Sequence, residues 1–409
     1  MLQIETVKNF KSTFTDANGC EVNIYASIND VPHGEWASCV KPDNLFLSEN
    51  YLKTVEASQL PGLQTRYAVI KYHSDSKAVL YFQIVNLSDK GLGGILNLDE
   101  YGGLASSLSS RINDLLFSPG GDKTSYLMVC GNLLVSGNHG IAASDKYAFA
   151  KALQCITALK KIIGQSLGSD ARLVAFMAKD FYEDENVQAA PILKKDYFLL
   201  NTDPEMIFTV NPEWNSFEDY LAALSSKYRI RANNAKSKLG TVEIKNLSLD
   251  DIIEKEQELF LLNDQVIRKA PVKLVRLSSS YFTNLKRNFG DNYNIKAFFL
   301  EGKMIAFTSA LWNEQHYEAH YIGIDYAYNS EYSLYQNILY SYINDAILSR
   351  ATKLFYGRTA LEIKSTVGAK PYQLYCYFRF ANRVINTLAR PLVSSTGPQN
   401  WISRDPFKK

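Results

Sequence analysis

The chain has 409 residues, which is too long for one ordinary hydrophobic core, so its length predicts two domains. Its 44 lysines and arginines are balanced by 42 aspartates and glutamates, which excludes a global basic field that would attract nucleic acid. The five cysteines form no CxxC pair and the five histidines are scattered, so neither a disulfide framework nor a metal site is indicated. The sequence has no signal pattern and no apolar run of about 18 residues, so we expect a cytoplasmic protein and leave a peripheral membrane contact open.

The first half of the chain changes from helical spacing to strand spacing. Residues 1–30 alternate polar and apolar side chains, which predicts one or two edge strands. Helix-like spacing follows on both sides of Pro42, and Ser48 is the expected N-cap of the second helix. Three strands, a helix and two further strands are then predicted at 66–73, 77–87, 125–135, 144–164, 171–181 and 196–200.

A basic helix is predicted over residues 216–239, with Ser216 as its cap and Gly240 as its stop. Its apolar face is flanked by cations, among them Arg229 and Arg231. One interpretation is a solvated rim whose aliphatic stems cover the edge of the core. The other is a rim that binds a phosphorylated donor or a polyanion.

The second half repeats the order of the first without repeating its residues. A strand and two helical regions come first, and Gly302-Lys303 is a strong hairpin signal. A long helix is expected to begin at Asn329 or Ser330. The elements are expected at 241–247, 249–267, 279–288, 294–302, 303–312, 316–324, 329–350, 354–356 and 374–380, with a short helix before the last strand.

The stretch from Lys353 to Tyr377 carries the densest chemistry. A strand is followed by a loop and a short helix that hold Arg358, Glu362 and Lys364. Folds of the α/β type present reactive groups in this way at the end of a sheet. The alternative is a surface loop whose charges are solvated, and the residues alone do not separate the two.

Three strands, a helix and two strands are the element order of the GNAT acyltransferase fold, and two such units in tandem resemble its FemAB-like branch. The segments that carry the resemblance are 27–58, 217–238 and 355–377, of which the last, FYGRTALEIKSTVGAKPYQLYCY, is the most specific. The resemblance implies an α/β (α+β) protein with two GNAT-like domains, each a mixed, mostly antiparallel sheet flanked by helices. We expect domains at 1–210 and 241–409, joined by the basic helix at 211–240.

The resemblance also implies transfer of an acyl or aminoacyl group to an amine. Gly357, Arg358, Lys364 and Gly368 match motif positions, and Glu362 lies beside them. Arg358 or Lys364 would stabilise an oxyanion or a donor phosphate, and Glu362 would orient or deprotonate the amine. Further candidate bases are His320 and Asp325, and the expected substrate-binding residues are Tyr356, Ser330, Tyr335, Arg229 and Arg231.

The donor is the less determined partner. GNAT enzymes bind the pyrophosphate of CoA on a glycine-rich loop before a helix, but residues 325–336 contain no glycine, and SGNHG at 136–140 is better explained as a hairpin turn. We therefore expect no permanently bound cofactor and an acyl thioester as co-substrate, on CoA or on an acyl carrier protein, with a small-molecule or lipid amine as acceptor. The alternatives are an aminoacyl-tRNA-dependent transferase for a peptidoglycan precursor and a non-catalytic double-GNAT binding module.

Overall fold

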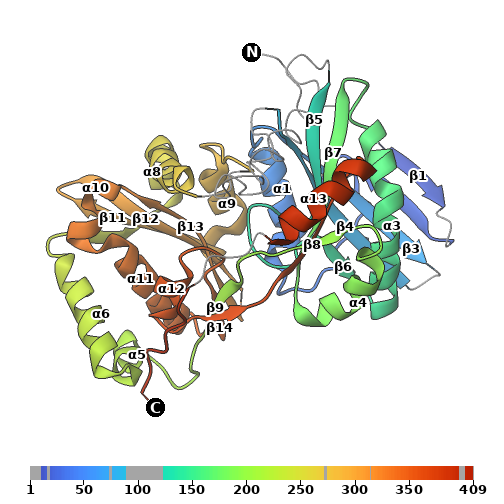
Figure 1. Cartoon of the computed structure of the whole chain (residues 1–409). Coiled ribbons are helices and arrows are strands. Elements are labelled where there is room, and N and C mark those ends of the chain that lie inside the picture. Colours follow the sequence, from blue (N-terminus) through green and yellow to red (C-terminus); the bar gives the residue numbers. More distant parts are fainter. Residues whose placement is uncertain are drawn as a thin grey trace. The chain divides into compact units, whose positions relative to one another are not determined.

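The computed structural model describes residues 11–15, 19–72, 76–88, 123–270, 274–313, 315–395 and 401–408 (Figure 1). The chain divides into two compact units. Unit 1 comprises Met1–Thr202, Pro271–Arg276 and Leu374–Pro398, and unit 2 comprises Asp203–Ala270, Leu277–Gln373 and Gln399–Lys409. Each unit is built on one mixed sheet with helices on it, as expected for two GNAT-like domains.

The sheet of unit 1 is antiparallel except where β5 and β7 run parallel. Its strands, in spatial order, are β1 (Lys11–Thr15), β2 (Glu21–Tyr25), β3 (Leu63–Tyr72), β4 (Ser76–Asn86), β5 (Thr124–Cys130), β7 (Ala171–Phe181), β16 (Tyr375–Phe380) and β8 (Phe198–Leu200), and β6 (Ile141–Ala143) pairs with β4. The helices are α1 (Glu49–Ala57), α3 (Lys146–Gln165), α4 (Glu183–Leu193) and α13 (Arg383–Ser395). The apolar face of α3 supplies Phe149, Leu153 and Ile156 to a core shared with the sheet.

The sheet of unit 2 likewise has one parallel pair, β13 and β14. Its spatial order is β10 (Glu243–Asn246), β11 (Tyr293–Leu300), β12 (Lys303–Trp312), β13 (His316–Ile324), β14 (Lys353–Phe355), β9 (Glu205–Thr209) and β15 (Lys370–Tyr372). The second of the two helices between β13 and β14, α11 (Leu334–Leu348), provides much of the core, because both its faces are rich in leucine, isoleucine and tyrosine. The helices are α5 (Phe217–Ala223), α6 (Ser226–Lys238), α7 (Leu249–Glu254), α8 (Glu256–Arg268), α9 (Tyr281–Phe289), α10 (Tyr326–Tyr332), α11 (Leu334–Leu348) and α12 (Leu361–Ser365).

Each sheet contains a strand that is distant in sequence. In unit 1, β16 lies between β7 and β8, and in unit 2, β9 lies between β14 and β15. Strand β9 directly follows β8, the strand before it in unit 1, but joins the sheet of unit 2. Strand β16 directly follows β15 of unit 2 but joins the sheet of unit 1, so the exchange is reciprocal. The boundaries therefore differ from the expected 1–210 and 241–409, because hydrogen bonding to β14 and β15 places β9 in unit 2 and hydrogen bonding to β7 and β8 places β16 in unit 1.

The structure corrects two of the predicted helices. The helix expected over 216–239 is broken at Leu224, which is extended because it bridges to Phe407, while the amide of Ser225 donates to the carbonyl of Pro406. The helix expected from Asn329 or Ser330 begins earlier, after Asp325, and breaks at Ser333, whose φ is 48°. Ser330 therefore lies inside α10 and offers no helix terminus to an anion.

Several local signals were correct. Ser48 caps α1 by accepting from the amide of Tyr51, and Ser216 caps α5. The β3–β4 and β11–β12 hairpins form where the alternation predicted them, the second through Gly302 with a φ of 82°. Helix α4, over Glu183–Leu193, was not predicted, and its internal Pro191 obscures its helical character.

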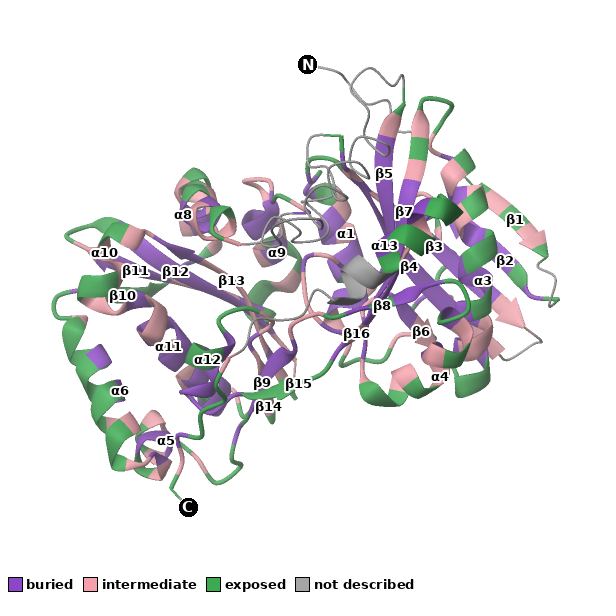
Figure 2. Cartoon of the chain, in the orientation of Figure 1, coloured by how far each residue is buried: buried purple, intermediate pink, exposed green. Residues whose placement is uncertain are grey.

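Figure 2 shows that burial is unevenly shared among the helices, since α6 is exposed along most of its length and α11 is largely buried. All five cysteines are buried and unpaired by disulfides. Among the described residues, no helix is both long and apolar enough to cross a membrane.

Replacing Phe378 by alanine tests the placement of β16. The side chain is fully buried and its ring centroid lies 5.5 Å from that of Phe198. We expect Phe378→Ala to lower the free energy of unfolding of unit 1 by about 3 to 5 kcal/mol. Hydrogen exchange followed by mass spectrometry should become faster in β7 and β8 and stay unchanged in β11 and β12.

The matched control is Tyr372→Ala, because Tyr372 is an aromatic residue of β15 that is 39% exposed. Faster exchange confined to unit 2 in the Phe378 variant would contradict the placement.

Candidate functional site

The chain leaves β14 through a tight loop, Gly357 to Ala360, that leads into α12. Gly357, Thr359 and Ala360 have positive φ angles of 67°, 69° and 49°. Glycine accepts this left-handed conformation, whereas a β-branched threonine is strained in it. Such strain persists only where the surroundings hold it, and it is common at functional sites. The loop therefore presents Arg358 just beyond β14 in a conformation that other contacts must maintain.

Lys364 of α12 supplies those contacts. Its side chain is buried, and Nζ donates to the carbonyl oxygens of Tyr356 at 2.8 Å, Gly357 at 3.3 Å and Arg358 at 2.6 Å. In its protonated form the Lys364 amino group has three hydrogens, one for each of these acceptors. The predicted role of Lys364 in binding an oxyanion or phosphate is thus corrected, because the side chain acts as a clamp on the loop.

Glu362 does not join Lys364 in a common groove. Residues two apart on a helix point to nearly opposite sides. The Glu362 carboxylate is exposed and accepts from Arg404 Nε at 3.1 Å and Nη2 at 2.6 Å. The sequence places Arg358, Glu362 and Lys364 close together and predicts that they face a common groove. The structure corrects this prediction, because Lys364 holds the loop on one side of α12 while Glu362 forms a surface ion pair on the other.

Lys364 lies in a cluster of charges at the start of β9. Burial lowers the pKa of Lys364 to about 7, and the carboxylates of Glu205 and Asp203 act in the opposite direction. Burial raises the pKa of Asp203, which Arg358 and Lys364 oppose by their positive charge. These mutual influences show that Glu205, Asp203, Arg358 and Lys364 share one electrostatic environment.

Glu318 of β13 belongs to the same environment. Glu318 is paired with Phe355 of β14, and Phe355 is paired with Ile207 of β9. Glu205 is two residues before Ile207 on β9, so its side chain lies on the same face of the sheet as that of Glu318. Burial, followed by the negative charge of Glu205, raises the pKa of Glu318 well above its ordinary value. A shift in this direction brings a carboxyl group closer to the pKa that a general acid or base needs near neutral pH.

These groups lie where the parallel pair of unit 2 ends. The pairing covers only His316–Glu318 with Lys353–Phe355, although β13 continues to Ile324. Ligands of α/β folds bind beyond the carboxyl ends of parallel strands. We define the carboxylates and cations at this point, Glu318, Glu205, Asp203, Arg358 and Lys364, as the β13–β14 cluster.

His320 lies on the same face of β13 as Glu318, two residues further along. Its Nε2 is 2.8 Å from the hydroxyl oxygen of Tyr281 on α9. Burial lowers the pKa of His320 to about 3, so its imidazole is neutral at physiological pH and a weaker base than an ordinary histidine, which argues against its predicted role as the base. The structure thus brings His320 near Glu318, which the sequence interpretation missed, although the spacing His316, Glu318, His320 marks a polar strand face.

The remaining predicted residues are dispersed. Asp325 caps α10 by accepting from the amide of Ala327 at 3.1 Å and pairs with Lys303 at 2.9 Å. Tyr356 is buried with its hydroxyl donated to the carbonyl of Leu339, which corrects its predicted role in binding substrate. Tyr335 is partly buried against the core of unit 2.

Arg229 and Arg231 lie on α6, which is held to the core of unit 2 by few side chains. Ala232 and Ala235 are the buried residues of this helix, and Asn337 of α11 donates to the carbonyl of Ala235 at 2.8 Å. Arg231 is exposed and Arg229 is half-buried. Neither arginine has an interaction that connects it to the β13–β14 cluster, so their substrate-binding role stays a prediction.

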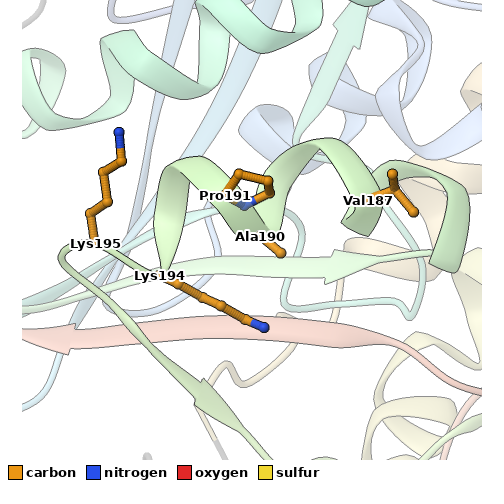
Figure 3. A pocket seen from close by; sticks show the side chains of 5 residues that line it. All are labelled: Val187, Ala190, Pro191, Lys194 and Lys195. Carbon is orange, nitrogen blue, oxygen red and sulfur yellow. The ribbon is translucent and has the colours of Figure 1, made fainter.

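A surface depression of about 480 Å³ lies at the end of α4 in unit 1 (Figure 3). Its lining consists of Val187, Ala190, Pro191, Lys194 and Lys195. Figure 3 shows that the two lysine side chains leave the helix end in different directions, so their ammonium groups do not converge. None of the sequence-predicted residues lines this depression, and within the described part of the chain no set of three histidine, cysteine, aspartate or glutamate side chains is placed to hold a metal.

The fold of the chain is similar to that of FemX. The solved structure of FemX matches 85% of this chain and 94% of its own, with a TM-score of 0.50 and 11% sequence identity. A conserved protein of unknown function from Bacteroides thetaiotaomicron VPI-5482 matches 87% of this chain and 98% of its own, with a TM-score of 0.47 and 13% identity. A tandem GNAT protein from the clavulanic acid biosynthesis pathway matches 88% of this chain and 99% of its own, with a TM-score of 0.44 and 9% identity.

The comparison at the level of sequence gives no further assignment, since neither a family model nor a curated protein matches the chain. The similarity to FemX supports the predicted fold. At 11% sequence identity it supports a statement about the fold and none about the activity.

The lowered pKa of Lys364 predicts a pH dependence of stability. The unfolded lysine titrates near 10.5 and the folded one near 7, so between these values the unfolded chain binds a proton that the folded chain has released. The free energy of unfolding should therefore rise with pH in this window, by up to about 1.4 kcal/mol per pH unit from this group. Urea unfolding at pH 7.5, 8.0, 8.5 and 9.0 should show this slope relative to Lys364→Met, which cannot titrate.

Lys370→Met is the matched control, because Lys370 is an exposed lysine of β15 and its replacement should preserve the slope. Equal slopes in wild type and Lys364→Met would show that Lys364 remains charged in the folded chain.

Proposed function

We propose that this chain is an acyltransferase of the GNAT type that transfers an acyl or aminoacyl group to an amine. The observation that carries the proposal is the β13–β14 cluster, in which Glu318 has a raised pKa beside the neutral imidazole of His320. The position of the cluster at the end of the parallel pair, in a fold shared with FemX, supports it.

The chemistry assigns a separate task to each group. Attack by an amine on an acyl carbon requires removal of a proton from the nitrogen, and Glu318, once ionised, would accept it. The oxyanion of the tetrahedral intermediate requires a fixed positive group, and Arg358 is presented for this on its strained loop. Lys364 acts indirectly, because it holds that loop by donating hydrogen bonds to the loop's backbone carbonyls.

The first helix between the two parallel strands of each unit informs the choice of donor. A CoA pyrophosphate would need free amides at such a helix N-terminus. In unit 2 the carboxylate of Asp325 occupies the start of α10, and in unit 1 that of Asp145 accepts from the amides of Tyr147 and Ala148, each at 2.8 Å. Two aspartate caps repel a pyrophosphate, so they favour an acyl carrier protein over CoA as the thioester donor.

The same caps support the second candidate function. An aminoacyl-tRNA brings its aminoacyl ester without a pyrophosphate, and the FemAB-like resemblance implies such a donor with a peptidoglycan precursor as acceptor. In the first candidate the acceptor is the amine of a small molecule or an amino-lipid.

Activity measurements on two glutamate variants test whether Glu318, which the structure indicates, or Glu362, which the sequence predicted, acts in catalysis. We expect Glu318→Gln to lower kcat at least about 100-fold with a small change in KM, because proton transfer by a positioned side chain contributes about 10²–10⁴-fold. Glu362→Gln should retain most of the activity, because that carboxylate is engaged with Arg404 at the surface. Full activity in Glu318→Gln together with loss in Glu362→Gln would overturn the assignment of the β13–β14 cluster.

Thermal unfolding with candidate donors tests the argument from the aspartate caps. A ligand that binds only the folded chain adds about 2.7 kcal/mol of stability at a hundred times its dissociation constant. We expect free CoA to leave the melting temperature unchanged and an acylated carrier protein or an aminoacyl-tRNA to raise it. A rise with free CoA that is retained with palmitoyl-CoA and acetyl-CoA would contradict the proposed choice of donor.

A further inference from the structure

Unit 1 contains a cluster of cations that the proposed acyl transfer does not use. Arg379 of β16 is paired in register with Phe176 of β7. It lies next to the start of β8, which Tyr197 directly precedes. Lys160 of α3 approaches the same face, with its Nζ 5.2 Å from the centre of the Phe176 ring and 5.8 Å from that of Tyr197. The strand exchange and the packing of α3 thus bring two cations from distant parts of the sequence together.

Aromatic rings support these cations. The guanidinium carbon of Arg379 lies 5.7 Å from the centre of the Tyr197 ring, so Tyr197 has a cation near it from both α3 and β16. Cation–π contacts of this kind are favourable while leaving the net positive charge of the cluster in place. Arg379 uses its Nε in a 3.4 Å hydrogen bond to the carbonyl of Phe380, which leaves the terminal nitrogens of its guanidinium group to face a partner of opposite charge.

Carboxylates neutralise the cluster poorly. Asp196 lies 3.8 Å from Arg379, but its side chain is 56% exposed, whereas that of Arg379 is 12% exposed. Lys160 forms no ion pair among the described residues, and Arg383 at the start of α13 adds a third positive charge close enough to affect it. Burial, followed by the charges of Arg379 and Arg383, lowers the pKa of Lys160 to about 8, and the negative charge of Asp196 opposes this shift only in part.

We propose that Lys160, Arg379 and Arg383 form a binding site in unit 1 for a phosphate group, carried by a soluble ligand or by a lipid headgroup. Three cations against one exposed carboxylate attract a doubly charged anion. The planar guanidinium of an arginine binds phosphate through paired hydrogen bonds, and the lysine ammonium adds a point charge. The site is distinct from the β13–β14 cluster of unit 2, and the inference holds whatever reaction that cluster performs.

The two sources of phosphate differ in what else they would contact. Helix α13 exposes Val384, which is 67% exposed, and Leu388, which is 53% exposed, one turn apart and next to Arg383. An apolar pair beside a cation suits a lipid surface, whereas a soluble phosphate needs only the cations.

The test compares a soluble anion with a lipid surface, using the full chain at pH 7 and low salt. Pyrophosphate is titrated by calorimetry, and vesicles of phosphatidylcholine with and without phosphatidylglycerol are tested by sedimentation. We expect Lys160→Gln and Arg383→Gln each to weaken binding about tenfold or more, because a hydrogen bond to a charged group contributes about 1.5–3 kcal/mol. Arg383 is exposed, so Arg383→Gln keeps the test valid if Lys160→Gln destabilises the fold.

Lys161→Gln and Arg390→Gln are the matched controls, since both residues are exposed cations on the same helices. Pyrophosphate binding that is lost in the two test variants and kept in the controls supports a soluble ligand, and the same pattern with anionic vesicles alone supports a lipid headgroup. Binding of neither, or binding that the test variants retain, would overturn the proposal. As a direct readout, the NMR titration of a ¹³C-methylated Lys160 should move toward the ordinary lysine pKa when pyrophosphate binds.

Discussion

The reciprocal exchange of β9 and β16 is the constraint on which both sheets depend. Each strand supplies the hydrogen bonds between two strands that would otherwise be separated, β14 and β15 in one unit and β7 and β8 in the other. Because strands β16 and β7 join residues about 200 positions apart, the sheets cannot be completed by local folding. The exchange also brings functional residues together, since Glu205 arrives with β9 and Arg379 arrives with β16.

Each proposed site contains a lysine whose amino group contacts uncharged groups. In unit 2 the ammonium of Lys364 is satisfied by three backbone carbonyls, which converts its charge into restraint of a strained loop. In unit 1 the charges of Lys160 and Arg379 lie beside aromatic rings, which leaves their electric field available to a ligand. The two lysines differ in the groups that their amino nitrogens contact, which are backbone carbonyls for Lys364 and aromatic rings for Lys160.

The element order and many boundaries could be predicted from the sequence because they depend on local signals. Ser48, Ser216 and the Gly302 turn are examples in which one residue type has a specific conformational task. The exchange could not be predicted, since β9 and β16 have ordinary strand patterns that do not specify a sheet. The helix break at Leu224 was missed for a related reason, because its cause is pairing with Phe407, which lies far along the chain.

The candidate site was predicted in part. The charged loop and His320 were identified from residue types, but the direction of each side chain was not. Glu362 and Lys364 are two residues apart on a short helix, and only the structure shows that one meets Arg404 while the other binds the loop. Glu318 was overlooked because a lone glutamate within an aromatic strand gives no motif, although its alternation with two histidines marks a polar face.

The burial of the five cysteines gives the molecule a practical property. Burial raises the pKa of Cys39 and of Cys130, so at neutral pH these thiols hold their protons and react slowly with alkylating reagents. A cysteine introduced at the exposed Thr359 would therefore take up a fluorophore or spin label ahead of the native thiols. Such a label would report on the movement of the Arg358 loop when a donor or an acceptor is added, without first removing any natural cysteine.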